Sequence, residues 1–156
     1  MFRKSKLPDV HDKVTRSRNM AAIRNKNTKP ELAVRRGLHA CGFRYRLHSR
    51  GLPGKPDLVL RKYKAVIFVN GCFWHGHECP LFKWPTSRAE FWRGKITGNI
   101  ERDRKNKAVL NLASWRTAYV WECALKGHGR IDAGEVIDSL SHWLIYGGNE
   151  LVIEGF

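Results

Sequence analysis

Residues 69–79 (VNGCFWHGHEC) combine two cysteines and two histidines directly after the apolar run AVIFV. Thiolates and imidazoles are the ligands that Zn²⁺ prefers, usually as a tetrahedron of four. Such donors at the end of a strand-like segment predict a loop that a metal ion fixes to the body of the protein. The adjacent aromatic residues Phe73 and Trp74 indicate that the same loop binds a planar group.

The chain is strongly basic. Its 156 residues contain 29 Lys and Arg against 14 Asp and Glu, a formal net charge of +15. This length fits one domain. So large an excess of positive charge favours a polyanionic partner, first of all nucleic acid. A ribosomal-type structural protein, or a soluble protein whose surface is merely basic, has the same excess of positive charge. Charge alone does not separate these classes from a nucleic-acid-binding protein.

The expected location is the cytoplasm. The apolar runs are far too short for a membrane span. The first residues (MFRKSKLPDV) are basic but have no apolar stretch behind them, so we expect no signal peptide. In a reducing compartment, four cysteines favour metal binding over disulfides.

The chain divides into a flexible basic arm (1–14) and a single domain (15–156). Residues 15–27 form a short predicted helix with Met20 and Ile23 on one face.

A second helix is expected to begin at Thr28, with Glu31 completing a capping box, and to end at Gly42. Cys41 lies on the apolar face of this helix and is interpreted as a small core residue rather than a metal ligand.

The later elements alternate between strand and helix patterns. Ser87 and Glu90 repeat the capping-box pattern at the start of one helix. Strands are expected at 43–48, 57–60, 64–70 and 117–123, and helices at about 87–114 and 132–146. This order predicts an α/β fold in which helices flank a central mixed sheet.

Five side chains compete for the metal site. Cys72 and Cys79 lie in the loop, Cys123 closes a later strand, and either His75 or His77 completes the set. The remaining histidine is then free for acid–base chemistry. The alternative is reduced core cysteines with unrelated surface histidines.

Asp57 begins a strand after GKP, where a carboxylate is well placed to bind Mg²⁺. Taken alone, this position is better explained by a turn-capping aspartate. The next strand (AVIFVNG) carries no carboxylate, so the other ligands must be a backbone carbonyl, phosphate oxygens and water. Asn70 adds a polar contact, and His75 is placed to deprotonate the attacking water.

Several longer motifs resemble one known family. DVHDKVTRSRNMAAIRNKNTKPE, LPGKPDLVL, VIFVNGCFWHGHEC, FWRGKITGNIERDRKN and VWECAL are similar to the very short patch repair (Vsr) DNA mismatch endonucleases, from residue 9 to about residue 124. The resemblance implies a restriction-endonuclease-like fold with a structural zinc. It also implies a Mg²⁺-dependent nick in one strand of double-stranded DNA, 5′ to the thymine of a T:G mismatch, the lesion left when 5-methylcytosine deaminates. We expect a monomer associated with the nucleoid, with other mismatch-repair proteins as further partners.

The resemblance also implies residue roles. Asp57 and the backbone carbonyl of Val69 correspond to Mg²⁺ ligands, and His75 to the residue that activates water. Glu31 and Asp103 correspond to further active-site positions, although the capping box is a competing explanation for Glu31.

The remaining assignments concern zinc and DNA. The zinc ligands correspond to Cys72, His77, Cys79 and Cys123, and the residues inserted at the mismatch to Phe73, Trp74, Trp92, Met20 and Ile23. Ordinary core packing is the alternative for the aromatic residues, and Trp92 lies at helical spacing from Ile96. Asn70 departs from the family, some members of which have a catalytic histidine there.

Two rival functions share these features. One is a non-catalytic, zinc-stabilised DNA-binding module in which Asp57 is only a turn residue. The other is a related endonuclease that cuts fully paired DNA.

Overall fold

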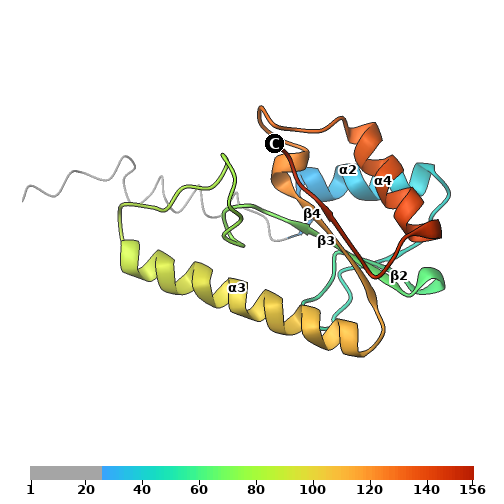
Figure 1. The fold of residues 1–156 in the computed structure, drawn as a ribbon, viewed down its shortest axis with the longest axis horizontal. Coiled ribbons are helices and arrows are strands. Elements are labelled where there is room, and N and C mark those ends of the chain that lie inside the picture. The colour runs from blue at the N-terminus through green and yellow to red at the C-terminus, as the bar shows by residue number, and fades with distance from the viewer. Residues whose placement is uncertain (1–25) are drawn as a thin grey trace, which may run out of the picture.

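The computed structural model describes residues 26–156, so Met20 and Ile23 lie outside the described residues. One sheet separates α3 on one side from α2 and α4 on the other (Figure 1). The helices are α2 (Lys29–Ala40), α3 (Ala89–Leu112) and α4 (Ala133–Tyr146), and the strands are β1 (Arg46–Leu47), β2 (Leu58–Leu60), β3 (Ala65–Asn70), β4 (Arg116–Trp121) and β5 (Glu150–Ile153).

The sheet is mixed, as expected, and its strands lie in the order β1-β2-β3-β4-β5. β1, β2 and β3 are antiparallel neighbours, whereas β3, β4 and β5 run parallel. The elements predicted from the sequence end with the last helix, whereas the chain forms a further strand, β5, after α4. Its residues are mostly solvent-accessible and become a strand only by pairing with β4.

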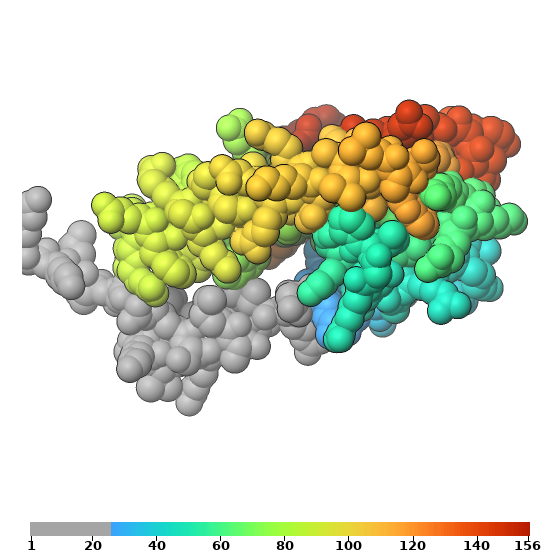
Figure 2. All heavy atoms as spheres, turned by 90° about the horizontal axis from the view of Figure 1, so that it is seen from below, coloured from blue at the N-terminus to red at the C-terminus, as the bar shows by residue number. Residues whose placement is uncertain are grey.

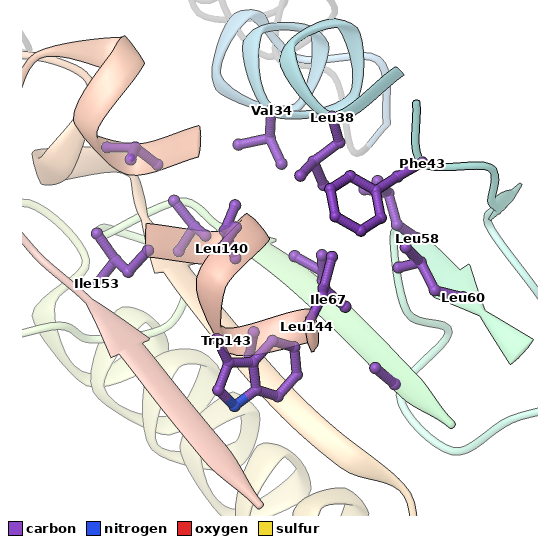
Figure 3. Close-up of a cluster of buried hydrophobic side chains, with 14 of the residues drawn as sticks. Val34, Leu38, Phe43, Leu58, Leu60, Ile67, Leu140, Trp143, Leu144 and Ile153 are labelled. Atoms are coloured by element: carbon purple, nitrogen blue, oxygen red, sulfur yellow. The ribbon is translucent and has the colours of Figure 1, made fainter. Parts of the chain in front are cut away.

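The main core lies between the sheet and the pair α2 and α4 (Figure 3). Burial of one large aliphatic side chain stabilises the fold by about 1.5–3 kcal/mol, so this cluster dominates the packing. It includes Val34, Leu38, Leu58, Leu60, Ile67, Leu140, Trp143 and Leu144.

A smaller apolar cluster on the other face holds α3 against the sheet. Leu110, near the end of α3, packs with Val59, Val66 and Phe68. In Figure 2, which views the molecule from the α3 side, the turquoise segment at residues 48–56 lies beside the orange half of α3. The N-terminal half of α3 extends past the sheet in Figure 1.

The helix ends show which local predictions were correct. Thr28 caps α2 as expected, because its side chain accepts a hydrogen bond from the Glu31 N–H at 3.3 Å. The Glu31 side chain instead accepts from the N–H of Asn27. The second capping box was wrong, because Arg88 is the N-cap of α3 and no side chain caps that end.

Two further expectations were wrong. Cys41 is exposed rather than part of the core, because it follows the last turn of α2. The strand expected at 43–48 shrinks to Arg46–Leu47, since Phe43 turns into the core and His48 takes a left-handed conformation (φ 48°).

Among residues 26–156, no helix is both long and apolar enough to span a membrane.

Candidate active site and metal centre

Asp57 lies directly before β2, which starts one residue later than predicted from the sequence, and contacts β3. Its Oδ2 accepts a hydrogen bond from the Val69 N–H at 2.6 Å, so the antiparallel pairing of β2 and β3 fixes the carboxylate. Burial raises the pKa of Asp57 to about 7; the Val69 N–H works against this shift, and the nearby Glu31 carboxylate adds to it. A carboxylate that is costly to leave buried and charged is a suitable ligand for a hard cation.

Glu31 lies behind Asp57 and is 1% exposed. Its Oε2 accepts from Arg35 at 3.1 Å, while its Oε1 is 2.9 Å from the His48 Nε2. The ligand atoms of Glu31, His48 and Asp57 lie within 4.8 Å of one another. Three residues that are distant in the sequence therefore form a group able to hold a metal ion. Glu31 thus has contacts beyond the N-terminus of α2.

His75, in the loop after β3, contacts Asp103 on α3. The His75 Nδ1 and the Asp103 Oδ2 are 2.5 Å apart. This contact orients the imidazole and leaves its Nε2 as the free nitrogen. Both residues line a cavity of about 260 Å³ together with Gly54, Lys55, Asp57, Phe68, Val69, Asn70, Asn106 and Tyr119.

That cavity brings together most of the catalytic candidates. Asp57, Val69, Asn70, His75 and Asp103 all border it, although they come from the residue before β2, from β3, from the loop after β3 and from α3. Asn70 is nearly buried, with 7% of its surface exposed. Its amide can hold a polar group but cannot exchange a proton.

The loop after β3 also contributes to a separate Cys/His cluster. The Sγ atoms of Cys72, Cys79 and Cys123 and a ring nitrogen of His77 lie within 4.8 Å of one another. His75 is paired with Asp103 instead. Three thiols and one imidazole are a donor set that zinc binds as a tetrahedron, so these residues fit that metal.

The protein backbone supports the sulfur atoms of this cluster. The N–H of Cys123 donates to the Cys72 Sγ at 3.3 Å, and the N–H of Gly155 donates to the Cys123 Sγ at 3.3 Å. Burial raises the pKa of Cys72 and of Cys123. The buried thiolate form therefore needs a positive charge close by, which a bound metal ion supplies.

Three aromatic rings form a half-buried group next to the loop. The Phe73 ring centroid is 5.3 Å from that of Trp74 and 5.3 Å from that of Trp92, and the two tryptophans are 5.6 Å apart. Asn99 on α3 donates to the Trp74 carbonyl oxygen at 2.9 Å. The group is packed and anchored but retains accessible surface, so it is neither a closed core nor a free loop.

Sequence reasoning missed three residues near these sites. His48 was interpreted as the end of a strand, although histidine is one of the residues that tolerate a positive φ. Trp121 and Glu154 contact His77 and were not considered. Only the position of Trp121 beside Cys123 in the sequence offered a signal for any of them.

Comparisons with known proteins agree on one family. A family profile described as DNA mismatch endonuclease Vsr matches residues 8–81. The Escherichia coli K12 protein named DNA mismatch endonuclease Vsr is 44% identical over 138 residues, covering 88% of each chain. Two proteins named type II nicking enzymes are each 47% identical: V.XorIIP of Xanthomonas oryzae pv. oryzae, covering 73% of this chain and 84% of the relative, and V.NmeAIP of Neisseria meningitidis serogroup A, covering 77% and 86%. This chain therefore belongs to the Vsr family of DNA mismatch endonucleases.

Proposed function

We propose that this protein is a Mg²⁺-dependent DNA mismatch endonuclease that nicks one strand 5′ to the thymine of a T:G mismatch. The observation that carries the proposal is the cavity in which Asp57, His75 and Asp103 meet, in a chain of this family. The antiparallel strands β2 and β3 beside the parallel β4 support a restriction-endonuclease-like fold. The protein acts as a monomer in the bacterial cytoplasm.

Asp57 and the backbone carbonyl of Val69 hold the Mg²⁺ in this proposal. When bound, the ion supplies positive charge that offsets the developing negative charge on the scissile phosphate. The buried Asp57 carboxylate, whose pKa is raised to about 7, fits this role because a cation favours its ionised form. Asp57 is also oriented in advance by the Val69 N–H.

His75 acts as the general base. With its Nδ1–H donated to Asp103, the Nε2 carries a lone pair that accepts a proton from the attacking water. The Asp103 carboxylate then stabilises the imidazolium that forms. This division of roles between an imidazole and a carboxylate is the usual one in hydrolytic sites.

Glu31 is a fixed, buried neighbour of Asp57. Arg35 and His48 hold its two oxygens, so the carboxylate stays in one orientation while nearly excluded from solvent. Asn70 contributes a polar contact at the cavity wall, without a proton-transfer role.

The zinc in this proposal is structural. Cys72, His77, Cys79 and Cys123 would supply four protein ligands, the set typical of structural zinc sites, which keep no position open for water. The loop between Cys72 and Cys79 carries His75 together with the aromatic pair Phe73 and Trp74. One fixed loop thus serves both proton transfer and mismatch recognition.

Mismatch selection rests on the aromatic group of Phe73, Trp74 and Trp92, assisted by Met20 and Ile23. A T:G wobble pair is easier to distort than a Watson–Crick pair, and wedging a step apart costs a few kcal/mol. Stacking of bases on exposed aromatic surface offsets that cost. Trp74 is partly exposed, which leaves surface for such stacking.

A nicking assay tests the proposal. Purified protein is incubated with Mg²⁺ and otherwise identical duplexes that carry T:G, C:G or an unrelated sequence. We expect one nick, 5′ to the mismatched thymine, and none in the other two. Cleavage of the C:G duplex indicates instead an endonuclease for paired DNA, and binding without cleavage indicates a non-catalytic module.

Asp57→Asn is the matched variant for this assay. It removes a metal ligand but no expected DNA contact, so nicking should disappear while T:G binding stays close to that of the wild type. Asp138→Asn, on α4 at the other face of the sheet, is the control and should nick normally. Full activity of Asp57→Asn refutes the Mg²⁺ assignment.

A further inference from the structure

We propose that Glu154 is a positioning residue for the zinc site, which it serves by orienting the imidazole of His77. This inference rests on the zinc ligands proposed above. The Glu154 Oε2 and the His77 Nε2 are 2.7 Å apart, although 77 residues separate them in the sequence. The His77 side chain is only 12% exposed, so few other groups are able to satisfy this nitrogen.

The two ring nitrogens of His77 face different partners. Its Nδ1 lies 3.7 Å from the Cys123 Sγ and therefore points into the thiol cluster, while Nε2 points to Glu154. A histidine that binds a metal through one nitrogen usually donates its other N–H to a carboxylate or carbonyl, which fixes the tautomer and makes the ligand more basic. Glu154 occupies this position.

Trp121 restricts the ring in a second direction. The indole and the imidazole are stacked, with centroids 4.1 Å apart and planes inclined by 13°. Stacking limits tilting of the imidazole plane, and the contact with Glu154 fixes the direction in which the Nε2 points, so the two contacts are complementary.

Residues 154–156 are themselves held close to the cluster. The Gly155 N–H donates to the Cys123 Sγ at 3.3 Å, and the Phe156 N–H donates to the Gly129 carbonyl at 3.0 Å. A Cβ at Gly155 would lie 2.2 Å from the Cys123 carbonyl oxygen, so only glycine permits this approach. β5 pairs with β4 through Ile153 directly before it, which places Glu154 reproducibly.

The contribution of Glu154 should therefore appear in metal affinity rather than in folding. Its side chain is 56% exposed, and an exposed ion pair contributes little to stability. Loss of a carboxylate that supports a metal-bound histidine typically weakens metal binding by about 10–100-fold. The segment directly after β5 thereby becomes part of the metal site.

Competition with a chromogenic zinc chelator measures this effect on purified protein. Glu154→Ala should weaken zinc binding by about 10–100-fold and release zinc faster. Glu154→Gln should remain close to wild type, because its amide oxygen still accepts from the His77 N–H. Glu150→Ala is the control: Glu150 begins β5, four residues before Glu154, but pairs with Lys107, and its replacement should leave zinc affinity unchanged.

The cobalt spectrum and the zinc affinities together decide the outcome. Cobalt-substituted Glu154→Ala should keep the absorption of a three-thiolate site, which shows that the ligands themselves remain intact. Equal zinc affinities of Glu154→Ala, Glu150→Ala and wild type overturn the inference while leaving the zinc site and the nicking activity standing. A wild-type protein that nicks T:G DNA but binds no zinc overturns the zinc assignment and this inference with it.

Discussion

His75 and Asp103 are 28 residues apart in the sequence, and the His75 Nδ1 lies 2.5 Å from the Asp103 Oδ2. The histidine belongs to the Cys/His loop and the aspartate to the middle of α3. Their contact joins these two segments at the wall of the cavity that contains Asp57. Because a carboxylate fixes the tautomer of its imidazole partner, the pair determines which nitrogen faces the cavity.

Replacement of Asp103 should therefore slow cleavage without unfolding the protein. Asp103→Asn removes the negative charge that stabilises the His75 imidazolium, and we expect nicking to fall by about 10²-fold or more. Glu101→Gln, at an exposed position on the same helix, is the control and should retain activity. Single-turnover rates on T:G duplex and melting temperatures of both variants provide the check. Wild-type rates for Asp103→Asn contradict the role.

A second prediction concerns stability in metal-free protein. The pKa of Asp57 is raised from 3.8 to about 7 in the folded state. Between these values the unfolded chain loses the proton while the folded protein keeps it, so stability falls as the pH rises, and above pH 7 the whole cost is present.

Asp57→Asn removes this titration. At pH 8 without divalent metal, the variant should be more stable than wild type by about 1–3 kcal/mol, and the two should converge near pH 4. Urea unfolding at both pH values, in chelator, measures the difference. Mg²⁺ should then stabilise only the wild type. A variant that is less stable at pH 8 shows that the Asp57 hydrogen bond to Val69 outweighs its burial.

Some features with a local cause were predictable from the sequence. Thr28 caps α2 as expected, through a bond to a residue within the same helical turn, whereas the equally local capping box expected at Ser87 and Glu90 did not form. The apolar runs that became β2 and β3 also needed no long-range information, since both strands are buried almost throughout.

Features that depend on distant contacts were not predictable in the same way. β5 is a short, half-exposed edge strand that exists through its pairing with β4. Spacing alone left open which histidine joins the cysteines, and the partners of His75 and His77 come from α3 and from the segment after β5. The pairing of His48 with Glu31 likewise depends on a turn of positive φ.

Removal of zinc should cost the protein most of its stability. We expect one zinc per chain, and Cys123→Ser should lose it together with the cooperative melting transition of the wild type. Cys41→Ser is the matched control, because Cys41 is exposed and lies outside the cluster. Metal analysis and thermal melting with and without chelator test this directly. A metal-free wild type whose melting is insensitive to chelators contradicts the assignment.

DNA binding should be strongly electrostatic, as the net charge of +15 requires. The affinity for any duplex should fall steeply with salt, with a log–log slope of several units. Arg104→Gln, at an exposed position on α3 next to Asp103, should reduce the slope by about one unit. Lys62 lies just before β3, at the end of that strand away from the cavity, and Lys62→Gln should leave the slope unchanged. Fluorescence anisotropy over a salt series measures both, and a flat dependence rules out a phosphate-binding surface.

The last prediction concerns Trp74, whose ring packs on Phe73 and Trp92 and remains partly accessible. Base–aromatic stacking is worth roughly 1–3 kcal/mol per base, so Trp74→Ala should weaken T:G binding by about one to two powers of ten. Paired DNA offers no gap to fill, and its weaker binding should scarcely change. The variant therefore loses discrimination rather than general affinity for DNA.

Tyr146→Ala provides the control for this experiment, because Tyr146 is 75% exposed at the end of α4, on the other face of the sheet. It should alter neither binding curve. Titration of T:G and C:G duplexes by anisotropy, combined with melting curves, distinguishes a residue inserted at the mismatch (a wedge) from a core residue. If Trp74→Ala melts much earlier and binds both duplexes equally poorly, Trp74 is a packing residue. The wedge must then lie on the remaining accessible surface of Phe73 and Trp92.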